Sequence, residues 1–219
     1  MVRIKEQPAC RSNYGGRRTG KIEWIVMHYT GNDGDSDEAN GRYFQQPLNP
    51  VASAHYFVDD DSITRSVPDD YVAYHCGAQR YRHPYCRNAN SIGVELCDAK
   101  RDGRVMATDK TIANAAELVY WLCRQYDIPY DHIIRHYDVT GKLCPAYWVH
   151  GDGLAKFRKQ VEEVGEVVEQ AKMIVDGRAV PVERILKNGT NYIKIRDVAK
   201  ALDLKVGFEG NIAVLRSKK

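Results

Sequence analysis

Short apolar runs separated by polar turns dominate the first two thirds of the chain. They are rich in β-branched or aromatic residues and lie at residues 22–29, 53–58, 63–67, 91–97 and 132–136. Runs of this length with polar boundaries predict buried β-strands. The acidic residues 59–61 predict a turn that joins the second and third strands.

Other segments repeat with a helical period. From residue 109 to residue 126, apolar side chains recur at three- and four-residue steps, and Thr108 is a suitable N-cap. A second amphipathic pattern runs over residues 153–171, and a short helix is expected over residues 37–46. The alternation of strands and helices predicts an α/β domain with a mixed central sheet flanked by helices.

The end of the chain has a different pattern. Hairpin signals occur at residues 176–177, 188–189 and 209–211, and a helical pattern covers residues 195–202. We therefore expect three parts: a first domain over 1–152, a helical linker over 153–171 and a small α+β domain over 172–219. A 48-residue domain is near the lower size limit for a self-sufficient core, which favours docking or a homodimer through this module.

Charge is unevenly distributed. Residues 172–219 hold 11 basic and 5 acidic side chains (+6), whereas residues 1–171 hold 21 and 24 (−3), and together these give the net +3. The basic module indicates an anionic partner, although charge that serves only solubility explains it equally well. The sequence does not indicate a nucleic-acid partner, and its apolar runs are too short to span a membrane. Because residues 1–8 lack an apolar segment, we expect cytoplasmic synthesis without a signal peptide.

The six cysteines are dispersed without a CxxC pair, so we expect mostly free, buried thiols. Cys144 has more suggestive neighbours. His136 precedes it by eight positions and Lys142 by two, and in an extended segment Lys142 and Cys144 would face the same centre. An imidazole and a thiolate suit zinc, and a catalytic zinc site usually has three protein ligands. His28, at the end of a predicted strand, is the candidate for the third.

Several motifs together resemble the zinc-dependent N-acetylmuramoyl-L-alanine amidases of the amidase type 2 class. That class includes phage endolysins and is similar to the peptidoglycan recognition proteins. The resemblance covers roughly residues 15–150. The residues that carry it are His28, Ser53-Ala54-His55-Tyr56, His75-Cys76-Gly77, Asn90-Ser91-Ile92-Gly93-Val94-Glu95-Leu96 and His136-x7-Cys144-Pro145. The C-terminal module more loosely resembles stalk-type domains of clostridial cell-surface enzymes.

The resemblance implies a peptidoglycan hydrolase that cleaves the amide between N-acetylmuramic acid and L-alanine. It implies Zn²⁺ held by His28, His136 and Cys144, with Glu95 as the catalytic acid and base and Lys142 beside the scissile carbonyl. His55, Tyr56, His75 and Asn90 match positions around the groove, as substrate-lining or second-layer residues. Some relatives place a tyrosine directly before the motif histidine, where this chain has Ala54.

Other readings stay open at this stage. Glu95 could be a structural acid paired with Arg135. The protein could be a non-catalytic peptidoglycan receptor, or a structural zinc protein whose fourth ligand is His132 or His75. We further expect residues 74–90 to line a groove, the module to meet anionic wall polymers, and the enzyme to reach the wall after phage or prophage lysis.

Overall fold

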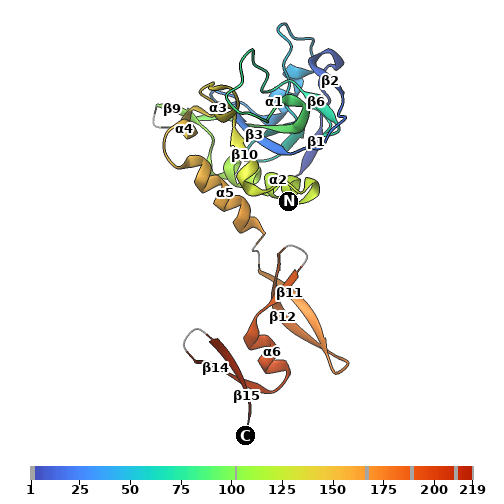
Figure 1. Ribbon diagram of the computed structural model, residues 1–219, viewed down its shortest axis with the longest axis vertical. Helices are drawn as coiled ribbons and strands as arrows, with labels where there is room; N and C mark the ends of the chain where they lie inside the picture. Colours follow the sequence, from blue (N-terminus) through green and yellow to red (C-terminus); the bar gives the residue numbers. More distant parts are fainter. Residues whose placement is uncertain (1–2, 102, 166–167, 188–189, 210–211, 219) are drawn as a thin grey trace. The chain divides into compact units, whose positions relative to one another are not determined.

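The computed structural model describes residues 3–101, 103–165, 168–187, 190–209 and 212–218. The chain divides into two compact units, residues 1–162 and residues 163–219. Figure 1 follows the first unit from blue to yellow-brown and the second from orange to red.

A six-stranded mixed sheet forms the centre of the first unit. Its strand order is β1-β5-β4-β7-β3-β10, and every neighbouring pair is parallel except β4 with β5. The predicted mixed α/β sheet is therefore confirmed. The strands are β1 (Ile4–Glu6), β3 (Trp24–Tyr29), β4 (Tyr56–Val58), β5 (Ile63–Arg65), β7 (Ser91–Leu96) and β10 (Ile133–Arg135).

Alternation along the strands gives the sheet two different faces. In β4, Phe57 packs with Phe44 of α1 (Asp37–Phe44), whereas the next residue, Tyr56, reaches Tyr126 of α2 (Asp109–Tyr126) through a shared carboxylate. Since neighbouring strand residues point to opposite faces, α1 and α2 cover opposite faces. In β7, Glu95 lies beside Phe57 in the strand register and therefore shares the α1 face.

Helix α2 matches the predicted range. The hydroxyl of Thr108 accepts a hydrogen bond from the backbone N–H of Thr111, as predicted for an N-cap, and the buried stripe of the helix contains Ala115, Val119 and Leu122. This stripe covers the sheet. Among the described helices, none is both long and apolar enough to cross a membrane.

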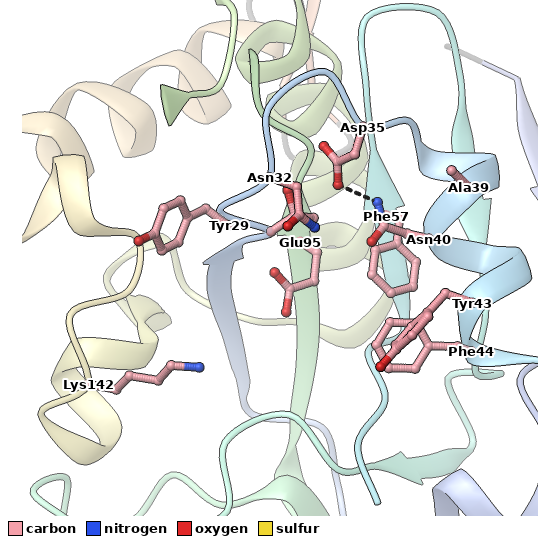
Figure 2. Close-up of a pocket in the computed structure, with 11 residues that line it drawn as sticks. Tyr29, Asn32, Asp35, Ala39, Asn40, Tyr43, Phe44, Phe57, Glu95 and Lys142 are labelled. Carbon is pink, nitrogen blue, oxygen red and sulfur yellow. Dashed lines mark hydrogen bonds between the residues drawn. The ribbon is translucent and has the colours of Figure 1, made fainter. Parts of the chain in front are cut away.

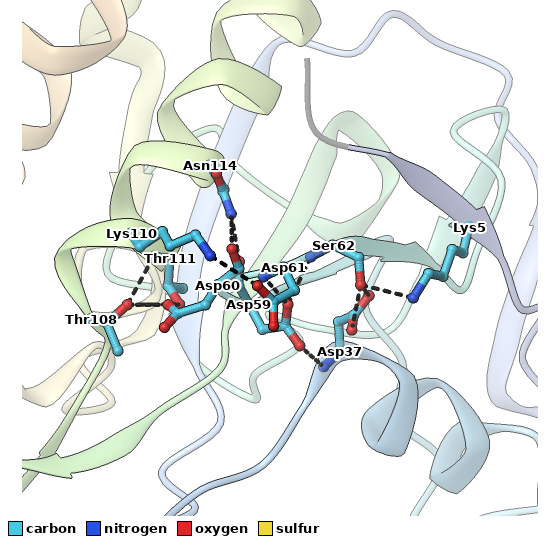
Figure 3. Close-up of polar contacts among 10 residues, drawn as sticks. All are labelled: Lys5, Asp37, Asp59, Asp60, Asp61, Ser62, Thr108, Lys110, Thr111 and Asn114. Carbon is cyan, nitrogen blue, oxygen red and sulfur yellow. Dashed lines mark hydrogen bonds and ion pairs between the residues drawn. The ribbon is translucent and has the colours of Figure 1, made fainter.

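The acidic turn between β4 and β5 anchors both helices (Figure 3). The carboxylate of Asp59 accepts a hydrogen bond from the backbone N–H of Asp37, in the first turn of α1, and two more from the backbone of the turn itself. Asn114 of α2 donates to the carbonyls of Asp59 and Asp60. A negative group at a helix N-terminus is favourable, so the turn stabilises the start of α1. Through Asn114 the same turn also holds α2 against the sheet.

Small elements complete the first unit. They are the helices η1 (Arg11–Asn13), η2 (Asn88–Asn90), η3 (Tyr130–His132), α3 (His136–Thr140), α4 (Ala146–Val149) and α5 (Gly153–Val164), and the strand pairs β2 (Tyr14–Arg17) with β6 (Tyr71–Ala73) and β8 (Ala99–Arg101) with β9 (Arg104–Met106).

Two predicted boundaries are wrong. His136 is not on a strand but is the first residue of α3, because the Asp138 carboxylate accepts a hydrogen bond from the backbone N–H of Arg135 and so starts a helix. The helix predicted over 153–171 ends at Val164. Gly165 disfavours its continuation, and Val168 pairs with Ile185 in a strand instead.

The second unit contains the antiparallel sheet β11 (Val168–Val175), β12 (Arg178–Lys187) and β13 (Thr190–Ile193), the helix α6 (Ile195–Ala201), and the ribbon β14 (Leu204–Glu209) with β15 (Ile212–Ser217). At the first hairpin, Asp176 and Gly177 both have positive φ, as the predicted two-residue turn requires. The other two strand pairs form, but the predicted turn residues 188–189 and 210–211 lie outside the described residues.

We predict that Thr108→Ala lowers the free energy of unfolding of the first unit by about 1 kcal/mol, because α2 loses its cap. Urea unfolding followed by tryptophan fluorescence measures this, since Trp24, Trp121 and Trp148 all lie in the first unit. Thr108→Ser keeps the hydroxyl and should unfold close to wild type. Equal loss in both variants would contradict the cap.

Candidate metal centre and adjoining pocket

The parallel pairing of β3 with β7 places His28 directly beside Glu95. Both residues are near the carboxyl ends of their strands and face the α1 side of the sheet. The Nδ1 atom of His28 lies 3.9 Å from Oε1 of Glu95, and the His28 ring is almost fully buried. The predicted location of His28 at a strand end is therefore confirmed.

The segment after β10 brings two further donors to His28. His136 opens α3, and its ring lies against that of His28 with 4.7 Å between the centroids. The helix ends at Gly141, whose φ of 87° suits glycine. The chain then returns, so that Sγ of Cys144 lies 3.7 Å from Nδ1 of His28, and the backbone N–H of Tyr137 donates to the carbonyl of Cys144.

These three side chains form a group that suits a metal ion. One donor atom from each of His28, His136 and Cys144 lies within 4.8 Å of the others, and all three residues are buried. Nδ1 of His136 is buried without a hydrogen-bond partner among the described residues. A buried polar atom normally has a partner, so an unpaired donor in a His-His-Cys group fits a metal ligand.

Burial sets the protonation states in this group. It lowers the pKa of His28 strongly and that of His136 to about 4, with the charge of Lys142 lowering the second further. Both imidazoles are therefore neutral at pH 7 and able to bind a metal. Burial raises the pKa of the Cys144 thiol to about 12, so a thiolate there requires a nearby cation.

Glu95 is a largely buried carboxyl group with a raised pKa and one oxygen that the described residues leave unpaired. Burial raises its pKa to about 8, although the charge of Lys142 opposes the rise, and its Oε2 atom has no hydrogen-bond partner among the described residues. The alternative pairing with Arg135 is wrong. The Arg135 guanidinium binds Asp138 and the backbone carbonyls of Trp148 and Val149 instead.

A pocket of about 580 Å³ opens beside Glu95 (Figure 2). Glu95 and Lys142 point into it from different elements, and the aromatic rings of Tyr43, Phe44 and Phe57 form the wall opposite Lys142. The rest of the lining comes from the end of β3, the loop after it and α1: Tyr29, Thr30, Asn32, Asp35, Ala39 and Asn40. The pocket thus combines one cation, an unpaired carboxyl and an apolar wall.

Residues 74–90 do not line this pocket, whose walls come from β3, β4, β7, α1, Lys142 and the loop after β3. Their expected role in lining a groove stays a prediction. Two residues of the segment, Cys76 and Cys86, pack nearer the start of β3, where they join Trp24 and Val26 in a buried cluster. The sequence signal for the aromatic wall was the adjacent pair Tyr43 and Phe44 at the end of a predicted short helix.

His55 and Tyr56 do not line this pocket, and their burial excludes direct contact with substrate. A second-layer role stays a prediction for His55, whose ring lies 5.6 Å from that of His75. His55 is completely buried, where Nδ1 accepts the backbone N–H of Gly93 and Nε2 contacts the Arg18 guanidinium. Tyr56 is also buried, and its hydroxyl donates to Asp69 on the α2 side of the sheet. Burial leaves neither side chain a surface for substrate.

Asn90 lies at the opposite end of β7 from Glu95 and does not line this pocket. It precedes the strand, whereas Glu95 is near its carboxyl end, and its amide caps the preceding turn by accepting the backbone N–H of Arg87. His132 is likewise at the far end of β3, stacked on Trp24, so it is excluded as a fourth metal ligand. His75 does reach the centre: its Nδ1 lies 3.0 Å from Nε2 of His28.

A family model described as N-acetylmuramoyl-L-alanine amidase (amidase type 2) matches residues 18–147, and the chain belongs to this family. The chain is 35% identical over 204 residues to the N-acetylmuramoyl-L-alanine amidase CwlL of Bacillus licheniformis, a match that covers 88% of this chain and 56% of that protein. It is 36% identical over 147 residues to the amidase BlyA of Bacillus subtilis (strain 168), covering 61% of this chain and 39% of that one.

Solved structures show the same fold. A mutant endolysin from Bacillus subtilis superposes with a TM-score of 0.61 at 25% identity, and the match covers 74% of this chain and 99% of that one. The PlyG catalytic domain gives a TM-score of 0.60 at 26% identity, and the match covers 74% of this chain and 94% of that one. The chain spans about half the length of the curated relatives that it matches first.

We predict that Tyr56→Phe lowers the free energy of unfolding by about 1.5–3 kcal/mol, because a buried hydrogen bond to a carboxylate is lost. Any peptidoglycan hydrolysis that the wild type shows should be unchanged in the folded variant. Tyr43→Phe, at a 57% exposed tyrosine, is the control and should change stability by less than about 0.5 kcal/mol. If Tyr56→Phe kept full stability but lost hydrolysis, a substrate role for Tyr56 would be restored.

Proposed function

We propose that the chain is a zinc-dependent peptidoglycan hydrolase that cleaves the amide between N-acetylmuramic acid and L-alanine of the stem peptide. Membership of the amidase family supports the substrate and the bond. The observation that carries the proposal is the buried group of His28, His136 and Cys144, with the Glu95 carboxyl 3.9 Å from His28.

His28, His136 and Cys144 would hold the zinc ion. Three protein ligands leave a position open, and zinc bound in this way polarises a carbonyl and lowers the pKa of water. The thiol is suited to this use, because its proton leaves readily only when a cation neutralises the sulfur.

Glu95 moves the proton in the proposed reaction. Its pKa, raised to about 8, suits a group that must both accept and donate a proton, and a nearby cation would lower that pKa. The carboxylate accepts a proton from the attacking water and then donates it to the nitrogen of the departing L-alanine. Its Oε2 atom, which lacks a described partner, has the capacity to hold that proton.

Lys142 stabilises the negative charge that develops on the scissile carbonyl oxygen. It lines the same pocket as Glu95, and its ammonium points into the shared space (Figure 2). A well-placed donor of this kind contributes about 3 kcal/mol to the transition state. The aromatic wall of Tyr43, Phe44 and Phe57 excludes water and orients the substrate across from Lys142.

We predict that Glu95→Gln lowers the rate of amide hydrolysis by about two to four orders of magnitude while zinc content stays at the wild-type level. Cys144→Ser should lose both zinc and activity. Mass spectrometry of digested peptidoglycan identifies stem peptides that begin with L-alanine, and metal analysis measures zinc in parallel.

The controls are Glu23→Gln, at the other end of β3, and Cys123→Ser, a buried cysteine on the α2 side. Both should keep zinc and hydrolysis. If wild type binds zinc but releases no stem peptide from any wall tested, the protein is a non-catalytic peptidoglycan receptor. If Glu95→Gln remains fully active, Glu95 is not the proton carrier.

We also propose that the C-terminal unit, residues 163–219, attaches the enzyme to the wall or pairs two copies. In its described residues, Val182 and Ala199 are the buried apolar side chains, whereas Ile174, Tyr192 and Phe208 are exposed. So small a core favours association with another surface. Its basic side chains favour an anionic wall polymer. Release of the enzyme by phage or prophage lysis remains a prediction.

We predict that replacing Lys172, Lys200 and Lys205 with Gln weakens sedimentation with walls several-fold at low salt and much less at high salt, because an ionic contact is screened. All three lysines are exposed. The matched control replaces the exposed Lys21, Lys100 and Lys156 of the first unit. Equal binding by the two triple variants, or an unchanged sedimentation on walls stripped of anionic polymer, would contradict ionic attachment.

A further inference from the structure

A chain of hydrogen bonds runs from His28 away from the metal centre. Nε2 of His28 lies 3.0 Å from Nδ1 of His75, and Nε2 of His75 lies 3.1 Å from Oγ of Ser91. The Ser91 hydroxyl donates to the backbone carbonyl of Arg87 at 2.7 Å. His75 is thus the link between the proposed metal ligand and the backbone.

The last bond in this chain fixes the direction of the others. A carbonyl only accepts, so the single hydroxyl proton of Ser91 is directed at Arg87, and Oγ must accept from His75. His75 then carries its proton on Nε2 and has a lone pair on Nδ1. That lone pair can accept only from Nε2–H of His28. Neutral His28 is left with a lone pair on Nδ1, the atom that faces Cys144 and Glu95.

The structure also fixes the His75 ring and the Arg87 carbonyl of this hydrogen-bond chain. Gly93 of β7 makes room for the His75 ring, because a Cβ atom there would lie 2.6 Å from Cγ of His75. At the other end, the Arg87 guanidinium donates to the carbonyls of His83 and Cys86 and stacks over the ring of Tyr81. The backbone around Arg87, including the carbonyl that accepts from Ser91, is therefore held by these contacts.

We infer that His75 is a positioning residue that selects the tautomer of His28 and aims its Nδ1 lone pair at the metal centre. The inference rests on the proposed zinc site, but the hydrogen-bond chain itself needs no metal. A ligand imidazole whose other nitrogen is fixed in this way binds metal more tightly, and loss of such a partner typically costs about 10–100-fold in affinity.

The test combines two readouts in the full chain. In the metal-free wild type, nitrogen-15 NMR should find His28 protonated on Nε2, with a proton that exchanges slowly with water. In His75→Phe, which keeps a ring but loses both nitrogens, that proton should exchange rapidly and both tautomers should appear. Zinc affinity, measured by competition with a chelator, should fall about 10–100-fold.

Two amide variants separate positioning from packing. The Asn side chain can place its oxygen near the position of Nδ1, so His75→Asn should retain the protected His28 proton and near-normal zinc affinity. The Gln amide reaches the position of Nε2 instead, so His75→Gln should behave like His75→Phe. His132→Phe, at a histidine stacked on Trp24 far from the centre, should change neither readout.

The inference fails if His75→Phe and His75→Gln keep the wild-type tautomer and zinc affinity, or if the Asn and Gln variants lose both equally. Ser91→Ala provides a milder variant, which should free the His75 tautomer and weaken protection of the His28 proton. If wild type has the predicted tautomer but binds no zinc, the proposed function fails while the hydrogen-bond chain stands.

Discussion

The parallel pairing of β3 with β7 is the constraint on which the site depends. Its register sets His28 beside Glu95, and a shift of one residue would turn one of them toward α2 on the other face. The register is secured by buried side chains on that other face, such as Ile25 and Val94. Packing of the hydrophobic core on the α2 side therefore fixes the chemistry on the α1 side.

Burial then determines which chemistry is available. The imidazoles of His28 and His136 are kept neutral, the thiol of Cys144 keeps its proton until a cation arrives, and the pKa of Glu95 is raised. Burying these groups costs stability unless each has a partner. His75 supplies one for His28, whereas Nδ1 of His136 and Oε2 of Glu95 have none among the described residues. These unpaired atoms lie where the proposed metal and substrate would complete the site.

The two units meet the same physical requirement differently. The first buries a continuous set of apolar side chains between a sheet and its helices, whereas the second leaves large apolar side chains such as Ile174 and Phe208 exposed. A small unit of this kind gains stability by covering apolar area with another surface. Its basic side chains restrict which surfaces are favourable. The proposed attachment of this unit would therefore also add to its stability.

The sequence by itself determined features that depend on neighbours along the chain. The period of α2 and its Thr108 cap, the strand ending at His28, and the turn at Asp176 are local, and the amidase resemblance located the His-His-Cys group. Tertiary structure alone decided the rest. His55 and Tyr56 do not line the pocket, because strand alternation and burial place them inside the protein. Helix α1 forms part of the pocket wall because the acidic turn holds it there. The direction of a side chain depends on which distant segment covers its face, and spacing along the chain does not contain that information.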